Sequence, residues 1–125
     1  MKYIFIDDEP IFNMISKTKL QQMDVNADVL TFDSGMDALK YFAENVNLVS
    51  KEKLIIFLDI NMPEMDGFDF LQEFNDKFDT SIQAIIFMLS SSIDSGDKEK
   101  AFQYPLVKNF HTKPFQLSYL NGIVN

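Results

Sequence analysis

The chain has no cysteine and no arginine. Without cysteine, it can form neither a disulfide framework nor a thiolate zinc site. Arginine is the residue most often used to grip bases and phosphates, and the formal net charge of −8 would repel a nucleic-acid backbone. The composition therefore argues against direct nucleic-acid binding.

Long apolar runs are missing as well, since none approaches the length that spans a bilayer. The apolar residues at the start of the chain reach the acidic run Asp7-Asp8-Glu9 too soon to form the core of a signal peptide. A cytoplasmic protein with no membrane partner is the simplest interpretation. The 125 residues are 46% hydrophobic, and no linker, repeat or low-complexity segment divides them. We expect a single domain over residues 1–125.

Short apolar runs alternate with longer segments of helical spacing. Strands are expected at residues 3–6, 28–32, 54–58, 84–89 and 106–110, and helices at residues 11–23, 36–44, 68–78, 94–102 and 115–123. Residues 45–53 are expected to form a loop. The first, third and fourth strand segments are almost continuously apolar, which is typical of central parallel strands buried on both faces. Five strand–helix repeats predict an α/β fold, a doubly wound five-stranded parallel sheet with helices on both faces.

Two of the expected helices carry stripes that we expect to pack on the sheet. The stripe of the first helix consists of Ile11, Met14, Ile15 and Thr18. The stripe of the third helix consists of Phe70, Leu71, Phe74 and Phe78. Most of the 13 phenylalanines fall on such stripes, which favours core packing over an aromatic cofactor site.

Polar side chains stand at the carboxyl ends of four expected strands. They are Asp7 and Asp8 after the first, Asp59 after the third, Ser90 after the fourth and Lys113 after the fifth. In doubly wound sheets, ligands bind beyond these ends. Each residue alone has a plain explanation, such as a helix cap or a solvated strand end. Four such coincidences, in an order that fits one fold, predict a single site.

The residue types at this site suit a divalent cation and a phosphoryl group. Three converging carboxylates repel one another unless a cation or a proton intervenes. An all-oxygen ligand set selects a hard cation such as Mg²⁺, which can bridge a carboxylate and a phosphoryl oxygen. Asp59 is the natural nucleophile, and its attack on phosphorus gives an acyl phosphate. Lys113 and Ser90 can each contact a phosphoryl oxygen, and Asn61 can offer its main-chain carbonyl to the metal.

With these residues, the chain resembles the receiver domain of response regulators in two-component signalling, which has a flavodoxin-like (βα)5 fold. The run Met62-Pro63-Glu64-Met65-Asp66-Gly67 fits a signature that is highly specific for that family. The other matching positions are the acidic pair Asp7-Asp8, the phosphoacceptor Asp59, the switch residues Ser90 and Phe110, and the closing Lys113-Pro114-Phe115. The resemblance runs from Tyr3 to about Leu120.

The resemblance implies a phosphorylation switch centred on Asp59. A sensor histidine kinase or a histidine phosphotransfer protein would supply the phosphoryl group. Mg²⁺ would be held by Asp8, Asp59 and the Asn61 carbonyl, with support from Asp7. The phosphoryl lifetime would depend on side chains near the attacking water, for which Asn61 and Ser92 are the expected positions.

The resemblance also implies how the signal leaves the domain. Ser90 would move toward the phosphoryl group and Phe110 would turn inward, which would change the surface of the fourth helix, fifth strand and fifth helix for an unknown downstream protein. Two features depart from the family pattern. Tyr104-Pro105-Leu106 replaces the usual Gly-Ala before the fifth strand, and Phe110 lacks a hydroxyl group. His111 is expected to be an ordinary strand residue.

Several alternatives stay open. The chain could be a receiver-like binding module that is never phosphorylated, or a small phosphatase with an aspartate nucleophile, of the haloacid dehalogenase type. Such a phosphatase would have a second aspartate where Asn61 stands and its nucleophile on the first strand, so the sequence favours a signalling protein over an enzyme. If the chain is complete, its output is a protein–protein contact. An output domain beyond residue 125 and a homodimer both remain open.

Overall fold

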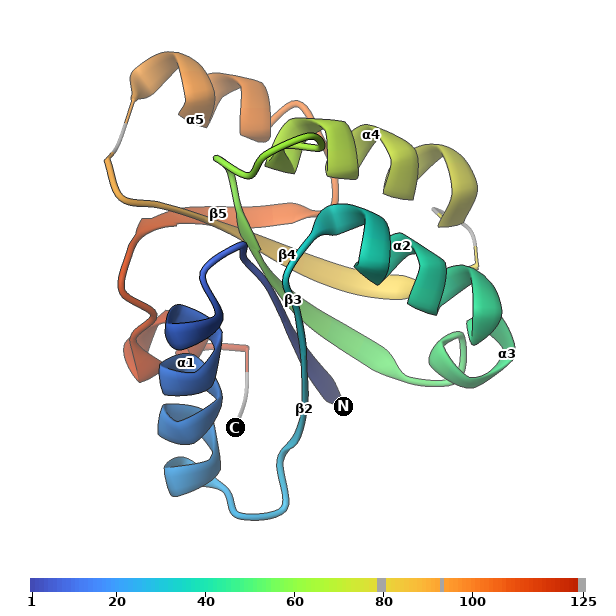
Figure 1. Ribbon diagram of the computed structural model, residues 1–125, viewed down its shortest axis with the longest axis vertical. Helices are drawn as coiled ribbons and strands as arrows, with labels where there is room; N and C mark the ends of the chain where they lie inside the picture. The colour runs from blue at the N-terminus through green and yellow to red at the C-terminus, as the bar shows by residue number, and fades with distance from the viewer. Residues whose placement is uncertain (79–80, 93, 124–125) are drawn as a thin grey trace.

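The computed structural model describes residues 1–78, 81–92 and 94–123. Five strands form one parallel sheet (Figure 1); they are β1 (Lys2–Ile6), β2 (Asp28–Phe32), β3 (Lys53–Asp59), β4 (Gln83–Ser90) and β5 (Val107–Thr112). The strand order is β2-β1-β3-β4-β5, so the winding direction reverses between β1 and β3. The predicted doubly wound, flavodoxin-like architecture is confirmed.

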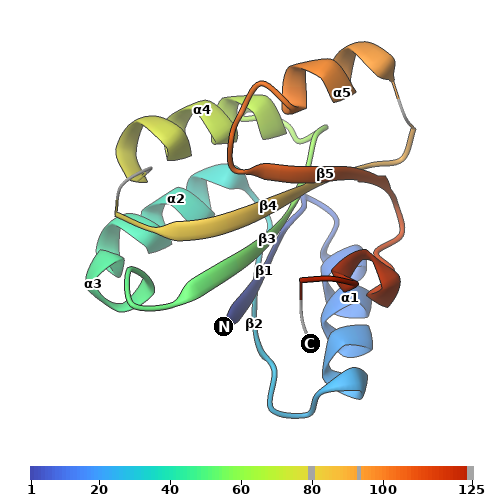
Figure 2. The same cartoon turned by 180° about the vertical axis from the view of Figure 1, so that it is seen from behind.

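Helices cover both faces of the sheet (Figures 1 and 2). One face carries α1 (Pro10–Met23) and the C-terminal segment with the 3₁₀ helix η1 (Leu117–Leu120). The other face carries α2 (Gly35–Glu44), α4 (Gly67–Phe78) and α5 (Ser95–Ala101). A one-turn helix, α3 (Val46–Val49), lies within the segment that was predicted as a loop. Within the described ranges, no helix has the length and apolar content needed to cross a membrane.

The helix starts follow from local capping chemistry. The Ser34 hydroxyl accepts a hydrogen bond from the Asp37 amide at 3.1 Å, which begins α2. The Asp94 carboxylate accepts from the amides of Gly96 and Asp97 at 2.7 and 3.2 Å, which begins α5. Proline is tolerated in a first helical turn, where its missing N–H has no partner to lose, and Pro10 begins α1. These residues fix where the chain leaves the carboxyl edge of the sheet.

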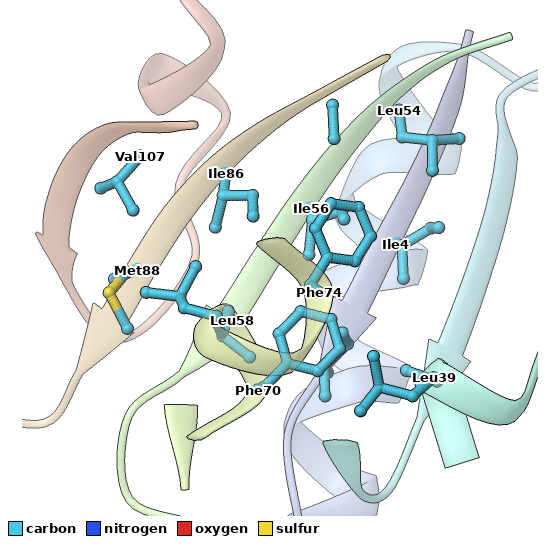
Figure 3. Packing of buried hydrophobic residues seen from close by; sticks show 14 of the residues in the cluster. Ile4, Leu39, Leu54, Ile56, Leu58, Phe70, Phe74, Ile86, Met88 and Val107 are labelled. Carbon is cyan, nitrogen blue, oxygen red and sulfur yellow. The ribbon is translucent and has the colours of Figure 1, made fainter. Parts of the chain in front are cut away.

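The sheet separates two hydrophobic clusters, because successive residues of each strand point to opposite faces. Figure 3 shows the cluster under α2 and α4, where Ile4, Ile56 and Leu58 of the strands meet Phe70 and Phe74. On the opposite face, the rings of Phe5, Phe57 and Phe87 lie side by side across three strands, with centroids 5.0 and 5.2 Å apart. Most phenylalanines are therefore core residues, as predicted.

The predicted buried face of α1 is wrong. Ile11, Met14 and Ile15 are 69%, 61% and 46% exposed. The buried residues of this helix are Asn13, Ser16 and Leu20. The carboxamide of Asn13 donates hydrogen bonds to two main-chain carbonyls at the strand ends, and these bonds fix the rotation of the helix. An apolar stripe is therefore left in solvent beside the acidic end of β1.

The predicted helix at residues 115–123 is also wrong. Only η1 forms there, followed by turn residues. Asn121 adopts an extended conformation, and Gly122 has φ of +82°, which glycine tolerates because it lacks a Cβ. Phe115 and Leu120 are buried nonetheless, and the Tyr119 hydroxyl donates to the Thr112 carbonyl at 2.7 Å. In place of the helix expected at residues 115–123, the structure has a short turn that is held by its own side chains.

The unusual turn before β5 accompanies an irregularity in the sheet. The Val107 amide donates to the Tyr104 carbonyl at 3.0 Å, which closes the turn around Pro105. Ile86 pairs with Val107 and Phe87 pairs with Asn109, so the register shifts by one residue at Lys108. Such a bulge re-aims the strand that follows it. The Tyr104 hydroxyl also donates to the Gln72 side chain at 3.3 Å, which ties this turn to α4.

Gly67, the first residue of α4, should tolerate no side chain. A Cβ built there would lie 2.6 Å from the Asp59 carbonyl oxygen and 2.9 Å from the Ile60 Cα, and neither backbone atom can move aside cheaply. We expect Gly67→Ala to lower the free energy of unfolding by about 2–3 kcal/mol, measured by urea denaturation. Gly35→Ala is the matched control, because Gly35 begins α2 and its added Cβ would approach side chains rather than backbone, namely Met65 at 3.0 Å and Phe70 at 3.4 Å. Equal losses in the two variants would contradict this account.

Candidate acidic site

Parallel pairing brings the three predicted carboxylates together. Ile6 of β1 pairs with Leu58 of β3, so Asp7 and Asp59 follow at the same level of the sheet. Both carboxylates are buried, whereas Asp8 is half-buried. One oxygen from each of Asp7, Asp8 and Asp59 lies within 4.8 Å of the others. The arrangement predicted from the strand ends is therefore present in the structure.

Lys113 completes this group from the end of β5. Its Nζ lies 2.7 Å from Asp7 Oδ2 and 3.2 Å from Asp59 Oδ1. Glu9, an exposed residue, lies 3.8 Å from the same ammonium. The Lys113 amide donates to the Ser90 carbonyl at 2.8 Å, and the peptide bond to Pro114 is cis. One cation thus contacts the ends of β1 and β3 while its backbone is anchored to β4.

The electrostatics of the site favour added positive charge. Burial, and then the neighbouring Asp7, raise the pKa of Asp59 to about 7, although Lys113 and the Asn61 main-chain amide act in the opposite direction. Burial also raises the pKa of Asp7, against the effect of Lys113. Burial would lower the pKa of Lys113, but its pairing with Asp7 and Asp59 prevails and raises it. One ammonium does not fully balance the buried carboxylates.

The ligand set fits a hard divalent cation. Asp7, Asp8 and Asp59 offer only oxygen atoms, and the cluster contains neither histidine nor cysteine. Magnesium prefers such ligands, completes its shell with water and needs an open side. Asp8 and the exposed Asn61 stand on the solvent side of the buried pair. These residues are the ones that would hold the cation.

The remaining predicted residues lie at or near the same edge. Ser90 ends β4 and is buried, and its hydroxyl accepts a hydrogen bond from the amide of the exposed Ser92 at 3.3 Å. Phe110 lies on β5 and is only 4% exposed, packed in the same cluster as the residues under α2 and α4. His111 points to the opposite face, where its ring stacks on Tyr119 at 3.8 Å. Burial, and then Lys98, lower the pKa of His111.

Sequence reasoning missed three residues that support the site. Asn13 donates from α1 to the Asp7 carbonyl at 2.9 Å. The centre of the Phe12 ring lies 4.8 Å from the Lys113 ammonium, and Glu9 Oε1 lies 3.8 Å from the same ammonium. A polar residue at helical spacing from Ser16 and Leu20 was the available signal for Asn13. It was outweighed by the apolar stripe on the other side of α1.

A hollow lies away from these residues. It measures about 370 Å³ and lies between α2 and α4; its lining residues are Met36, Leu39, Lys40, Ala43, Met65, Glu73, Lys77 and Phe78. No member of the acidic cluster lines it. The acidic site is instead an open edge, which suits exchange of a small charged group with solvent and with a partner.

The sheet is parallel, and an acidic cluster paired with Lys113 lies at its carboxyl edge. These features define a class of α/β domains whose polar site lies where the strand order reverses, here between β1 and β3. The sequence matches the response regulator receiver domain family over residues 4–125. The chain belongs to this family, as its resemblance indicated.

Individual relatives support the assignment. Protein PilG of Pseudomonas aeruginosa is 32% identical over 126 residues, which cover 99% of this chain and 84% of that protein. A two-component response regulator from Cytophaga hutchinsonii is 27% identical, with a TM-score of 0.84 over 96% of this chain and 90% of that one. The receiver domain of the histidine kinase CKI1 from Arabidopsis thaliana, solved with Mg²⁺ and BeF3⁻, is 25% identical, with a TM-score of 0.71 over 86% and 79% of the two chains.

Without a divalent cation, stability should fall as pH rises from about 4 to about 7. The folded chain holds the Asp59 proton up to a pKa of about 7, whereas the unfolded chain releases it near 3.8. Asp59→Asn should therefore unfold at a higher temperature than wild type at pH 8 in EDTA. The pKa shift limits the gain to about 4 kcal/mol, and we expect about 1–2 kcal/mol because Lys113 loses a partner.

Thermal unfolding across this pH range measures the effect, and Asp76→Asn, at an exposed carboxylate on α4, is the control. The advantage of Asp59→Asn over wild type should shrink toward pH 4. An advantage that is absent at pH 8, or that does not change with pH, would contradict the electrostatic account of the site.

Proposed function

We propose that the chain is a phosphoryl-accepting signalling switch and that Asp59 is the acceptor. A carboxylate oxygen of Asp59 attacks the phosphorus of a phosphohistidine. The O–P bond forms, the N–P bond breaks and the donor histidine keeps the electron pair. Water later attacks the same phosphorus, the bond between Asp59 and phosphorus breaks, and the Asp59 carboxylate and inorganic phosphate are the products. Because the phosphoryl group ends on the chain itself and then on water, the protein acts as a signal carrier rather than as an enzyme with a separate substrate.

The observation that carries this proposal is the contact of Lys113 with Asp59. A buried nucleophile with an ammonium 3.2 Å away has a counter-charge in place for a phosphoryl oxygen. Asn61 stands where a phosphatase of the alternative type would need a second acid, and Asp59 ends the third strand rather than the first. Both features favour a self-modifying switch over a phosphatase.

Magnesium is the proposed cofactor, with Asp8, Asp59, Asp7 and the Asn61 carbonyl as its ligands or supports. When bound, the cation would offset the charge that develops on the phosphoryl oxygens during transfer. The Mg²⁺ and BeF3⁻ complex of the related CKI1 receiver domain supports this assignment. We further propose that Asn61 and Ser92, both exposed beside the site, set how readily water reaches the phosphoryl group.

The proposed output runs through Ser90 and α5. The Ser90 hydroxyl already holds the amide of Ser92, so its rotation toward a phosphoryl group would release the segment that leads into α5. Phe110 is already buried, so this switch does not depend on an inward turn of its ring. The downstream partner would meet the surface formed by α5, β5 and η1, where Phe102 and Leu117 are exposed. We also propose that the chain is a single domain and that it is cytoplasmic. A homodimer would form through this same surface.

The exposed stripe of α1 is the proposed docking surface for the phosphoryl donor. Ile11, Met14 and Ile15 are consecutive neighbours on one helix face, which begins directly after the acidic run. Apolar patches at a surface mark protein contacts more often than small-molecule sites. A histidine kinase or phosphotransfer protein seated there would lie beside the open side of the acidic site.

Incubation with Mg²⁺ and acetyl phosphate tests the proposed acceptor. Intact mass should show the addition of one phosphoryl group to wild type, dependent on Mg²⁺, and none to Asp59→Asn. Asp66→Asn is the control, because this residue shares the loop after β3 but lies outside the acidic cluster. If wild type is unmodified under these conditions, the chain is a receiver-like binding module and the proposal fails. If Asp59→Asn is modified as much as wild type, another residue is the acceptor and the proposal also fails.

The docking surface makes a separate prediction. Met14→Lys should slow phosphoryl transfer from a histidine kinase that phosphorylates wild type by roughly tenfold, because the charge would be buried in the contact. Its modification by acetyl phosphate should be unchanged. Leu48→Lys is the control, since Leu48 is 65% exposed on α3, at the opposite edge of the sheet. Equal kinase rates for the two variants would place the donor elsewhere.

A further inference from the structure

Asn13 lies under the loop that carries the acidic pair. It is 2% exposed on α1, and its Nδ2 donates to the Asp7 carbonyl at 2.9 Å and to the Phe32 carbonyl at 3.2 Å. Both partners are acceptors only, so the nitrogen of the carboxamide must be the atom that faces them. The side chain therefore has one orientation in this environment.

These bonds fix two strand ends relative to each other. The Asp7 carbonyl belongs to the planar peptide group that joins Asp7 to Asp8, so holding its oxygen sets the direction in which the Asp8 side chain leaves the backbone. Phe32 is the last residue of β2, and its carbonyl also accepts from the Asp7 amide at 3.1 Å. Asn13 thus clamps the loop after β1 against the end of β2.

Folding alone does not explain this residue. Asn13 Oδ1 is buried and has no hydrogen-bond partner among the residues that the structure describes. A buried acceptor without a donor is destabilising, and such groups in native proteins call for an explanation. A leucine would fill nearly the same space without that penalty, but it would leave the Asp7 carbonyl without this donor. The donor end of the carboxamide therefore both fixes the rotation of α1 and holds the Asp7–Asp8 peptide.

We propose that Asn13 is a positioning residue of the acidic site, which orients Asp8 for the cation by holding the Asp7 carbonyl against the end of β2. This inference rests on the proposed function, since it takes the acidic cluster to be a Mg²⁺ site. Residues that orient metal ligands typically change metal affinity by about 10–100-fold when they are replaced. Asn13 acts through Asp8 and contacts neither the cation nor the phosphoryl group.

The Mg²⁺ dissociation constant of the unphosphorylated chain tests this role, measured by calorimetry and by the NMR shifts of the Asp8 and Asp59 amides. Asn13→Leu and Asn13→Ala should bind Mg²⁺ roughly tenfold more weakly than wild type. Asn13→Leu should remain folded in EDTA, because a leucine fills nearly the same space. Ser16→Ala is the matched control, because Ser16 is an equally buried polar residue one turn further along α1, and it should bind Mg²⁺ as wild type does.

The possible failures are distinguishable. If wild type does not bind Mg²⁺, the proposed function fails along with the inference. If wild type binds Mg²⁺ and both Asn13 variants bind it equally well, only the positioning role is overturned. If the Asn13 variants do not fold in EDTA, or if Ser16→Ala weakens Mg²⁺ binding as much, Asn13 serves the packing of α1 and the inference is also overturned.

Discussion

The ammonium of Lys113 lies between two buried carboxylates, and the carboxyl edge of the sheet depends on these ion pairs. The register of β1 and β3 forces Asp7 and Asp59 to the same level, where two negative charges in a poorly solvated place repel each other. Lys113 reaches them from β5 while its amide is held by Ser90 of β4. One residue therefore balances charge at the ends of β1 and β3 and links them to β4 and β5.

One ammonium does not fully offset the buried carboxylates, and the site therefore favours the binding of a further positive charge. The apolar framework is well packed on both faces of the sheet, so it can carry an edge that is not optimised for stability. Burial, and then the charge of Asp7, raise the pKa of Asp59 to about 7, so excess negative charge is poorly tolerated there. A cation would relieve that excess. Under the proposed function, a phosphoryl group on Asp59 would change the hydrogen bonds of Ser90 and, through them, the surface that α5, β5 and η1 form.

Most of the fold was predictable because its signals are local. Continuous apolar runs marked the strands of a sheet covered on both faces, and polar residues marked where those strands end. The errors came from contacts between distant segments. The rotation of α1 is fixed by bonds from Asn13 to the carbonyls of Asp7 and Phe32, so the apolar stripe containing Met14 faces solvent. The last segment is held by Phe115 and Tyr119 rather than by helical hydrogen bonds.

Sequence patterns alone predict the order of the five strands, the residues available at the carboxyl edge and the family to which the chain belongs. Strand ends and motif spacing are properties of short segments, and parallel pairing then leaves them only one edge on which to meet. The charges that pair, the buried face of α1 and the direction of the Asn13 carboxamide are seen only in the folded chain. They depend on distances between residues far apart in the sequence, and the local spacing of Asn13, Ser16 and Leu20 competes with an apolar stripe on the other side of the same helix.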